Sequence, residues 1–257
     1  MNFQSLYGPW ALITGASSGL GEHYARAIAK KGLNLILIAR RKERLENLAS
    51  DLTNKHSIQT HVIALDLCEE HALKKIKEAT IDKDIGLVIN NAGFGAKSEF
   101  LKTEADTLSK MIKLNCNVPV MLTHLFLPQL KQRKRSGIIN LASVVGFQAS
   151  PFMSVYGATK GFDLLFSESL SEEFSESGVD VLAVCPGSTD TEFHTIAGSE
   201  ATFPMLDDPK LVVMKSLKCL GKKSVYIHSA KYQILLFLNK ILPRSIVAKV
   251  AKKIINR

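Results

Sequence analysis

The sequence predicts an α/β fold in which a doubly wound parallel sheet is covered by helices on both faces. Short apolar segments alternate along the 257 residues with longer amphipathic stretches, which is the pattern of strand–helix–strand crossovers. Most of the apolar segments are continuous, as expected for strands that are buried on both faces. Single domains of this kind often reach the length of this chain.

The expected elements follow one another as strand and helix. Gly221 would end the helix predicted at 208–220, because glycine favours the left-handed backbone conformation at which helices often end. The predicted strands are residues 10–14, 34–39, 61–65, 87–90, 137–141, 179–184 and, after that helix, 224–227. The predicted helices are about 19–31, 42–55, 69–79, 103–114, 118–133, 155–177 and 208–220.

The net charge of +9 is unevenly distributed. Residues 1–209 contain 21 basic and 24 acidic residues, whereas residues 210–257 contain 12 basic residues and no acidic one. The body is therefore slightly acidic, and no aromatic residues are interleaved in a basic patch. Both features argue against a nucleic-acid partner.

The cysteines and the chain start favour a cytoplasmic location. The four cysteines are far apart and form no CxxC pair, so we expect neither a metal site nor a redox motif. Residues 1–4 lack the charged and apolar regions of a signal peptide. The longest apolar run near the end, Ile234–Leu238, is far too short to span a bilayer.

A glycine-rich turn, Thr14–Gly21, directly follows the first predicted strand and opens a helix. Glycines allow a tight turn and a close approach of the backbone to a pyrophosphate, and the helix start supplies free N–H groups. A glycine-containing turn without a ligand is the alternative. The turn favours dinucleotide binding.

Arg40 and Arg41 stand at the end of the second strand, where an NAD enzyme usually has a carboxylate for the ribose 2′-hydroxyl. Guanidinium groups instead suit a 2′-phosphate, which they bind through paired, charge-assisted hydrogen bonds. The alternative is that both are surface residues at the start of a helix. We therefore predict NADP (NADPH) as the cofactor, with NAD less favoured.

Tyr156 and Lys160 are four residues apart in a predicted helix and so share one face. A lysine ammonium and a nicotinamide ring would both lower the tyrosine pKa and suit it to proton transfer. Ser143 follows the fifth strand, where its hydroxyl could stabilise a developing alkoxide. Each residue alone has an ordinary explanation, but together they predict a catalytic site.

Collinear motifs extend this pattern over about residues 9–195, and the chain resembles the short-chain dehydrogenase/reductase family. The motifs are TGxxxGxG, Asp66-Leu67, Asn90-Asn91-Ala92-Gly93, Asn115, Ser143, Tyr156-x-x-x-Lys160 and Pro186-Gly187 with Thr191. The segments GPWALITGASSGLG, ARR and, in the tail, LPR are similar to those of the DltE-like branch, which is related to long-chain 3-ketoacyl and 17β-hydroxysteroid reductases. The resemblance implies a seven-stranded Rossmann sheet.

The resemblance also implies the domain organisation and the site. Residues 1–220 would form the NADP-binding catalytic domain, and residues 221–257 its last strand and a basic helical extension. Catalysis would rest on Asn115, Ser143, Tyr156 and Lys160. The cofactor would be bound by Gly15, Ser17, Ser18, Gly19, Leu20, Gly21, Arg40, Arg41, Asp66, Leu67, Asn91, Ala92, Gly93, Tyr156, Lys160, Pro186, Gly187, Thr189 and Thr191.

The resemblance assigns particular roles to several of these residues. Asp66 would face the adenine, and Asn115 would hold a water that links Lys160 to solvent. Asn90 and Asn91 would either contact the adenine ribose or tie the strands together. Thr191 would either bond the nicotinamide carboxamide or cap a helix.

The predicted function is hydride transfer between NADP(H) and a carbonyl or alcohol, with Tyr156 as the proton donor. A catalytically silent dinucleotide-binding regulatory or scaffold protein is the alternative. The small-molecule substrate would be apolar if the residues beside the site line its pocket, although they could equally be core. These residues are Val144, Val145, Phe152, Met153, Phe193, Phe203 and Met205.

The basic tail contains an apolar segment, 232–242, and an amphipathic helix from Ser245 with lysines opposite its apolar side. Such a helix could contact an anionic membrane peripherally. The alternative, which is slightly favoured, is that this helix packs on the body of the protein or on a partner subunit. The resemblance implies a homodimer or homotetramer.

Overall fold

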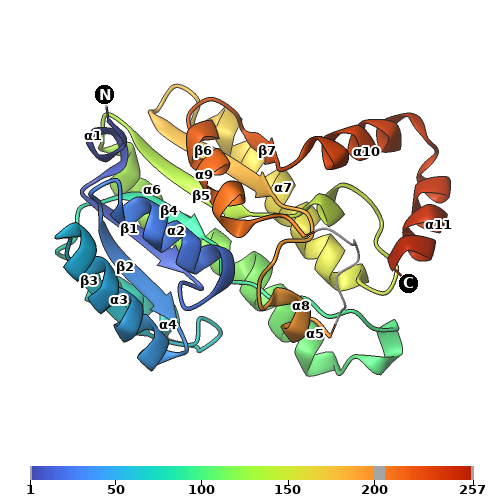
Figure 1. Ribbon diagram of the computed structural model, residues 1–257, viewed down its shortest axis with the longest axis horizontal. Helices are drawn as coiled ribbons and strands as arrows, with labels where there is room; N and C mark the ends of the chain where they lie inside the picture. The colour runs from blue at the N-terminus through green and yellow to red at the C-terminus, as the bar shows by residue number, and fades with distance from the viewer. Residues whose placement is uncertain (1, 199–205, 256–257) are drawn as a thin grey trace.

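The computed structural model describes residues 2–198 and 206–255 and contains a seven-stranded sheet (Figure 1). The strands lie in the order β3-β2-β1-β4-β5-β6-β7, and all neighbours are parallel. The predicted doubly wound parallel sheet is confirmed. The strands are β1 Trp10–Thr14, β2 Asn34–Ala39, β3 Thr60–Ala64, β4 Ile85–Asn90, β5 Ser136–Leu141, β6 Val179–Cys185 and β7 Val225–Ile227.

Helices cover both faces of this sheet. The two larger apolar cores lie one beneath α2, α3 and α9 and the other beneath α4, α6 and α7. Their bounds are α2 Gly19–Ala29, α3 Lys42–His56, α4 Ala72–Ala79, α6 Val118–Lys131, α7 Ser154–Glu173 and α9 Pro209–Cys219. The central strands are buried on both faces, which is why their sequences are continuously apolar.

Several boundaries differ from the sequence prediction. The helix expected from residue 69 begins at Ala72, and a short helix at the chain start, α1 Phe3–Tyr7, was not expected. The helices expected at 103–114 and 118–133 are not separated. Helix α5 (Ala105–Ile112) continues through a π-helical turn, Lys113–Asn117, directly into α6.

The remaining short helices lie in the loops beside the carboxyl ends of the strands. They are two 3₁₀ turns, η1 Phe100–Lys102 and η3 Val144–Phe147, and α8 Phe193–Ile196. Because η3 and α8 follow β5 and β6 respectively, both stand where an open parallel sheet places its ligand site.

The basic tail forms two helices, α10 Ala230–Ile241 and α11 Arg244–Ile255, joined at Leu242-Pro243. They lie beyond the β7 edge of the sheet (Figure 1). The second helix starts one residue before the predicted Ser245. None of the helices within residues 2–198 and 206–255 has the length and apolar character needed to cross a bilayer.

Candidate active site

The glycine-rich turn after β1 is held by the chain that follows β4. The Asn91 amide donates to the carbonyl oxygens of Thr14 (2.9 Å) and Gly15 (3.3 Å). Gly15 has φ +66°, and a Cβ there would lie 2.7 Å from the Asn91 amide nitrogen. A Cβ at Gly21 would lie 2.2 Å from the Gly15 carbonyl oxygen. Close packing therefore requires glycine at both positions, and at Gly15 the left-handed backbone requires it as well.

Arg41 reaches over this turn. Its guanidinium donates to the Ser17 hydroxyl (3.1 Å) and the Ser18 hydroxyl (2.5 Å). It also pairs with Glu192 (2.9 Å), which Arg44 contacts from the other side (2.6 Å). Arg41 thus places a positive charge beside the predicted phosphate turn, and Glu192 links the turn to the segment after β6.

The other predicted adenine-side residues lie where strands β2 and β3 end. Arg40 is exposed at the end of β2. Leu67 is buried, and the Asp66 carboxylate accepts the Cys68 backbone N–H (2.9 Å) in a local turn. These two segments lie side by side in the sheet, on one side of β1. Asp66 and the arginines are consequently at the same edge of the sheet.

The segment after β6 approaches the glycine-rich turn from the opposite side. A Cβ at Gly19 would lie 3.3 Å from the Thr191 Cβ, so the two loops are in contact. The Thr191 hydroxyl accepts a long hydrogen bond from the Phe193 N–H (3.4 Å), which is consistent with its predicted capping role. Thr189 is buried and bonds the Gly187 carbonyl oxygen (3.1 Å), and the Pro186 carbonyl oxygen accepts from Ser143 (3.4 Å).

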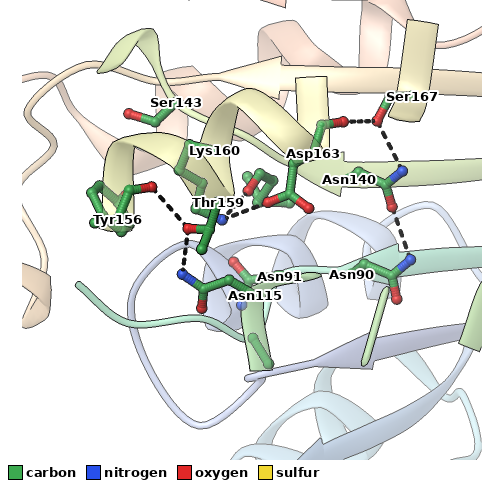
Figure 2. A network of polar contacts seen from close by, with 12 residues as sticks. Asn90, Asn91, Asn115, Asn140, Ser143, Tyr156, Thr159, Lys160, Asp163 and Ser167 are labelled. Atoms are coloured by element: carbon green, nitrogen blue, oxygen red, sulfur yellow. Dashed lines mark hydrogen bonds and ion pairs between the residues drawn. The ribbon is translucent and has the colours of Figure 1, made fainter. Parts of the chain in front are cut away.

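Ser143, Tyr156 and Lys160 lie close together at the carboxyl end of β5 (Figure 2). All three are less than a tenth exposed. The Lys160 ammonium lies 6.0 Å from the centre of the Tyr156 ring and donates to the Leu141 carbonyl oxygen (2.5 Å). Helix α7 approaches η3 closely, because Gly146 leaves no side chain between the two backbones. The structure therefore brings the predicted catalytic residues together.

The pKa of Tyr156 departs from the sequence prediction. Burial raises this pKa, whereas the Lys160 ammonium and the Ser143 hydroxyl lower it, and the net direction is upward. The lysine thus acts in the predicted direction but does not outweigh burial in the folded chain. Burial lowers the pKa of Lys160, but the neighbouring Asp163 carboxylate and Tyr156 together raise it, and the net direction is upward, so the amine is held as an ammonium ion.

Asn115 lies in the π-helical turn that joins α5 to α6 and is fully buried. Its amide group donates to the Phe94 carbonyl oxygen (2.9 Å) and the Thr159 hydroxyl (3.0 Å), and its oxygen accepts from the Phe94 N–H (3.1 Å). The side chain therefore fastens the chain after β4 to α7. Turns of this kind occur often at functional sites. The water relay through Asn115 stays a prediction.

Asp163 lies beside the catalytic residues and was missed by the sequence analysis, as was Glu192 beside Arg41. The Asp163 carboxylate pairs with the Lys160 ammonium at 2.9 Å, and both side chains are less than a tenth exposed. One of its carboxylate oxygens has no hydrogen-bond partner among the described residues. The spacing of Lys160 and Asp163, three apart on a helix, was the available signal, but a lysine–aspartate pair at this spacing is usually a surface feature.

Beside this pair a chain of polar side chains ties the sheet to α7 (Figure 2). The Asn90 amide donates to Asn140 (2.8 Å), the Asn140 amide donates to Ser167 (2.9 Å), and Ser167 donates to the Asp163 carbonyl oxygen (2.6 Å). Asn90 therefore joins β4 to β5, which is the structural alternative for this residue.

The apolar residues predicted to line a substrate pocket are placed in part. The Phe193 ring lies 5.3 Å from the Tyr156 ring, centre to centre. Val144, Val145, Phe152 and Met153 are half-buried in and after η3. Phe203 and Met205 lie outside the described residues. Within the described parts of the chain, no three His, Cys, Asp or Glu side chains are grouped to hold a metal ion.

Known proteins match this chain in sequence and in structure. Residues 9–201 match the family model of short chain dehydrogenases. Very-long-chain 3-oxoacyl-CoA reductase of Bos taurus is 32% identical over 84% of this chain and 70% of that protein. The 7beta-hydroxysteroid dehydrogenase of Clostridium sardiniense is 30% identical over 88% of each chain. A short-chain dehydrogenase from Sphingobium yanoikuyae, solved with NADPH, superposes with a TM-score of 0.82, at 34% identity and with 91% of this chain and 94% of that chain covered.

The chain belongs to the short-chain dehydrogenase family. It is an oxidoreductase that acts on a carbonyl or alcohol group with a nicotinamide dinucleotide. The relationship to ketoacyl and steroid reductases that the sequence suggested is also found among its relatives.

Proposed function

We propose that this protein reduces an apolar ketone or aldehyde with NADPH and catalyses the reverse oxidation with the same groups. The observation that carries the proposal is the convergence of Ser143, Tyr156 and Lys160 at the end of β5 (Figure 2). They are buried together at the carboxyl ends of the parallel strands, where the glycine-rich turn follows β1. A catalytically silent scaffold would not need the buried ion pair between Lys160 and Asp163 at this position.

In the proposed reaction NADPH, when bound, supplies a hydride to the carbonyl carbon. The Ser143 hydroxyl donates to the carbonyl oxygen and stabilises the negative charge that develops there. Tyr156 gives its phenolic proton to the same oxygen, which completes the alcohol.

Lys160 would support this proton transfer in two ways. An ammonium group has three N–H donors, and Lys160 uses one for Leu141 and one for Asp163. The third is left to bind the ribose of the cofactor. Its positive charge favours the phenolate that Tyr156 becomes after proton transfer.

The preference for NADPH over NADH rests on Arg41. Its guanidinium lies on Ser17 and Ser18 of the predicted phosphate turn and is about two-fifths exposed, so it can turn to meet a 2′-phosphate. Arg40, exposed beside it, adds a second positive charge. The relative solved with NADPH supports this preference.

An apolar substrate is supported by the surroundings of Tyr156. The Phe193 ring packs against the phenol, and half-buried apolar side chains of η3 follow Ser143. The two named relatives reduce or oxidise molecules with large apolar parts, a very-long-chain 3-oxoacyl-CoA and a hydroxysteroid.

Self-association is the proposed state of the protein. The exposed Phe162 and Leu165 of α7 support the expected homodimer or homotetramer, because such apolar side chains are suited to contact a second copy. The cytoplasmic location and the division of the domain at residue 220 stay predictions from the sequence.

The test is NADPH oxidation measured with a panel of 3-oxoacyl thioesters, steroid ketones and small polar ketones. We expect turnover with apolar members of the panel. Tyr156→Phe should lower the rate by roughly 10²–10⁴, the usual contribution of a general acid, and should still bind NADPH. Tyr24→Phe is the matched control, because Tyr24 is also buried but its hydroxyl bonds that of Ser216 on α9.

Two outcomes would contradict the proposal. Unchanged turnover in Tyr156→Phe would remove the assigned proton donor. Tight NADPH binding without turnover of any panel member would instead favour the scaffold alternative.

A further inference from the structure

Helix α10 carries an apolar stripe that faces away from the body of the protein. Ile234, Phe237, Leu238 and Ile241 are spaced i, i+3, i+4 and i+7, so they share one face of the helix. Their exposed fractions are 62%, 63%, 50% and 68%. Scattered exposed apolar residues are ordinary, but four on one helical face form a contiguous surface.

This stripe is not the face by which α10 packs on the body. The opposite side of the helix carries Tyr232 and Leu236, which are 2% and 5% exposed. The Tyr232 hydroxyl accepts the Ser188 N–H at 3.1 Å, and the Asn239 amide bonds the side chain of Gln148. The helix is thus fixed to the segments after β5 and β6, and its second apolar face points outward.

Exposed apolar side chains also occur in the connection and on the next helix. Leu242 in the connection and Ile246 and Val250 on α11 are 43–45% exposed, whereas Val247 and Ala251 pack inward. The two helices form one end of the molecule, beyond β7 (Figure 1).

Positive charge accompanies this surface. Six exposed basic side chains stand on α10 and α11, and apart from Lys231, which pairs with Asp207, none of them forms an ion pair with the described residues. No acidic residue occurs between residues 210 and 257. The other five are Lys240, Arg244, Lys249, Lys252 and Lys253.

We infer that α10 and α11 dock this protein on an anionic lipid bilayer, with the apolar stripe of α10 in the headgroup region. An apolar helix face accompanied by lysines and arginines suits this location, because acyl chains cover the apolar residues and anionic headgroups meet the basic ones. The inference concerns a surface outside the catalytic site and goes beyond the proposed reaction.

The charge distribution favours lipid over a second copy of the chain. A two-fold contact brings the same patch of both copies together. It would set these five basic side chains against their own copies, with no acidic residue of the tail to separate them. An anionic bilayer carries the complementary charge.

The experiment is flotation of the full-length protein with phosphatidylcholine vesicles and with vesicles that also contain phosphatidylglycerol. We expect recovery with the anionic vesicles, weak recovery with the neutral ones, and loss of binding as salt is raised. Ile234→Ser with Phe237→Ser should weaken binding about tenfold or more, since two exposed apolar side chains would no longer enter the bilayer. Lys252→Glu with Lys253→Glu should weaken it by a similar factor.

Ile81→Ser is the matched control, because Ile81 is 83% exposed in the connection between α4 and β4. It should bind vesicles like the parent. All these positions are exposed, and thermal melting checks that each variant folds. Equal recovery of the protein in the floating fraction with anionic vesicles and in their absence would overturn the inference. So would conversion of a parent dimer to a monomer by the α10 variant, which would assign the stripe to a second copy.

Discussion

Asp163→Asn removes the carboxylate that lies against the Lys160 ammonium while keeping the size of the side chain. At 2.9 Å two unit charges attract by about 6 kcal/mol if the effective dielectric constant is about 20. Much of this attraction is offset by desolvation of both groups. Removing one member of a buried pair nevertheless costs about 3–5 kcal/mol, because the other charge is left uncompensated.

We expect the lower end of that range, about 3 kcal/mol, because the asparagine oxygen still accepts a hydrogen bond from Lys160. The assay is urea unfolding followed by circular dichroism, with the free energy of unfolding extrapolated to water. Asp51→Asn is the matched control. Asp51 pairs with Arg26 and Lys55 on the surface, so its loss should change the free energy of unfolding by about 1 kcal/mol or less.

A second readout separates a role at the site from a purely structural one. Asp163 raises the pKa of Tyr156, and Lys160 lowers it. With a neutral residue at 163 and Lys160 still charged, the phenol should ionise at lower pH. The acidic limb of the rate of alcohol oxidation should then move to lower pH. Stability equal to that of the parent, together with an unmoved limb, would refute this account of the pair.

Three further substitutions test other parts of the structure. Arg41→Ala should raise the KM for NADPH roughly tenfold or more, as expected for loss of a charged hydrogen-bond donor, and change that for NADH much less; equal changes would contradict the assignment. Gly146→Ala should lower the free energy of unfolding by about 1–3 kcal/mol, because its Cβ would lie 2.6 Å from the Lys160 backbone; a thermal melt like that of the parent would show that η3 can move away. Burial lowers the pKa of His228, which bonds Tyr226, so the unfolded chain takes up the proton first and stability should fall as pH drops below about 6.5. His228→Gln should reduce this dependence, and an identical pH profile of stability would place its origin elsewhere.

The sequence was sufficient to predict the sheet because each strand has a recognisable local pattern. Residues such as Leu35–Ile38 are apolar without interruption because helices cover both faces of the sheet. The start of α4 was predicted too early, and its N-cap residue, His71, makes no side-chain capping bond that the sequence could indicate. The π-helical turn was missed because it continues a helix without a break that the sequence could show.

The candidate site likewise contains residues that the sequence predicted and residues that it did not. Tyr156 and Lys160 were predicted from their spacing on one helix, and the structure places them with Ser143. Glu192 was missed because the Arg41 side chain that it contacts lies 151 positions away in the sequence, and no local pattern indicates this contact. Asp163 was missed because only burial distinguishes its pair with Lys160 from a surface pair. The direction of the Tyr156 pKa shift depends on burial too, which the spacing does not reveal.

The central claim is that this protein transfers hydride from NADPH to a carbonyl carbon. It is tested most directly with NADPH deuterated at the transferred position and the best ketone of the panel, followed by mass spectrometry of the product. The account predicts an alcohol that carries one deuterium in place of hydrogen at the former carbonyl carbon, and roughly 10²–10⁴ less of it in the same time with Tyr156→Phe. NADPH consumption without deuterium at that carbon, or equal labelling by the variant, would contradict it.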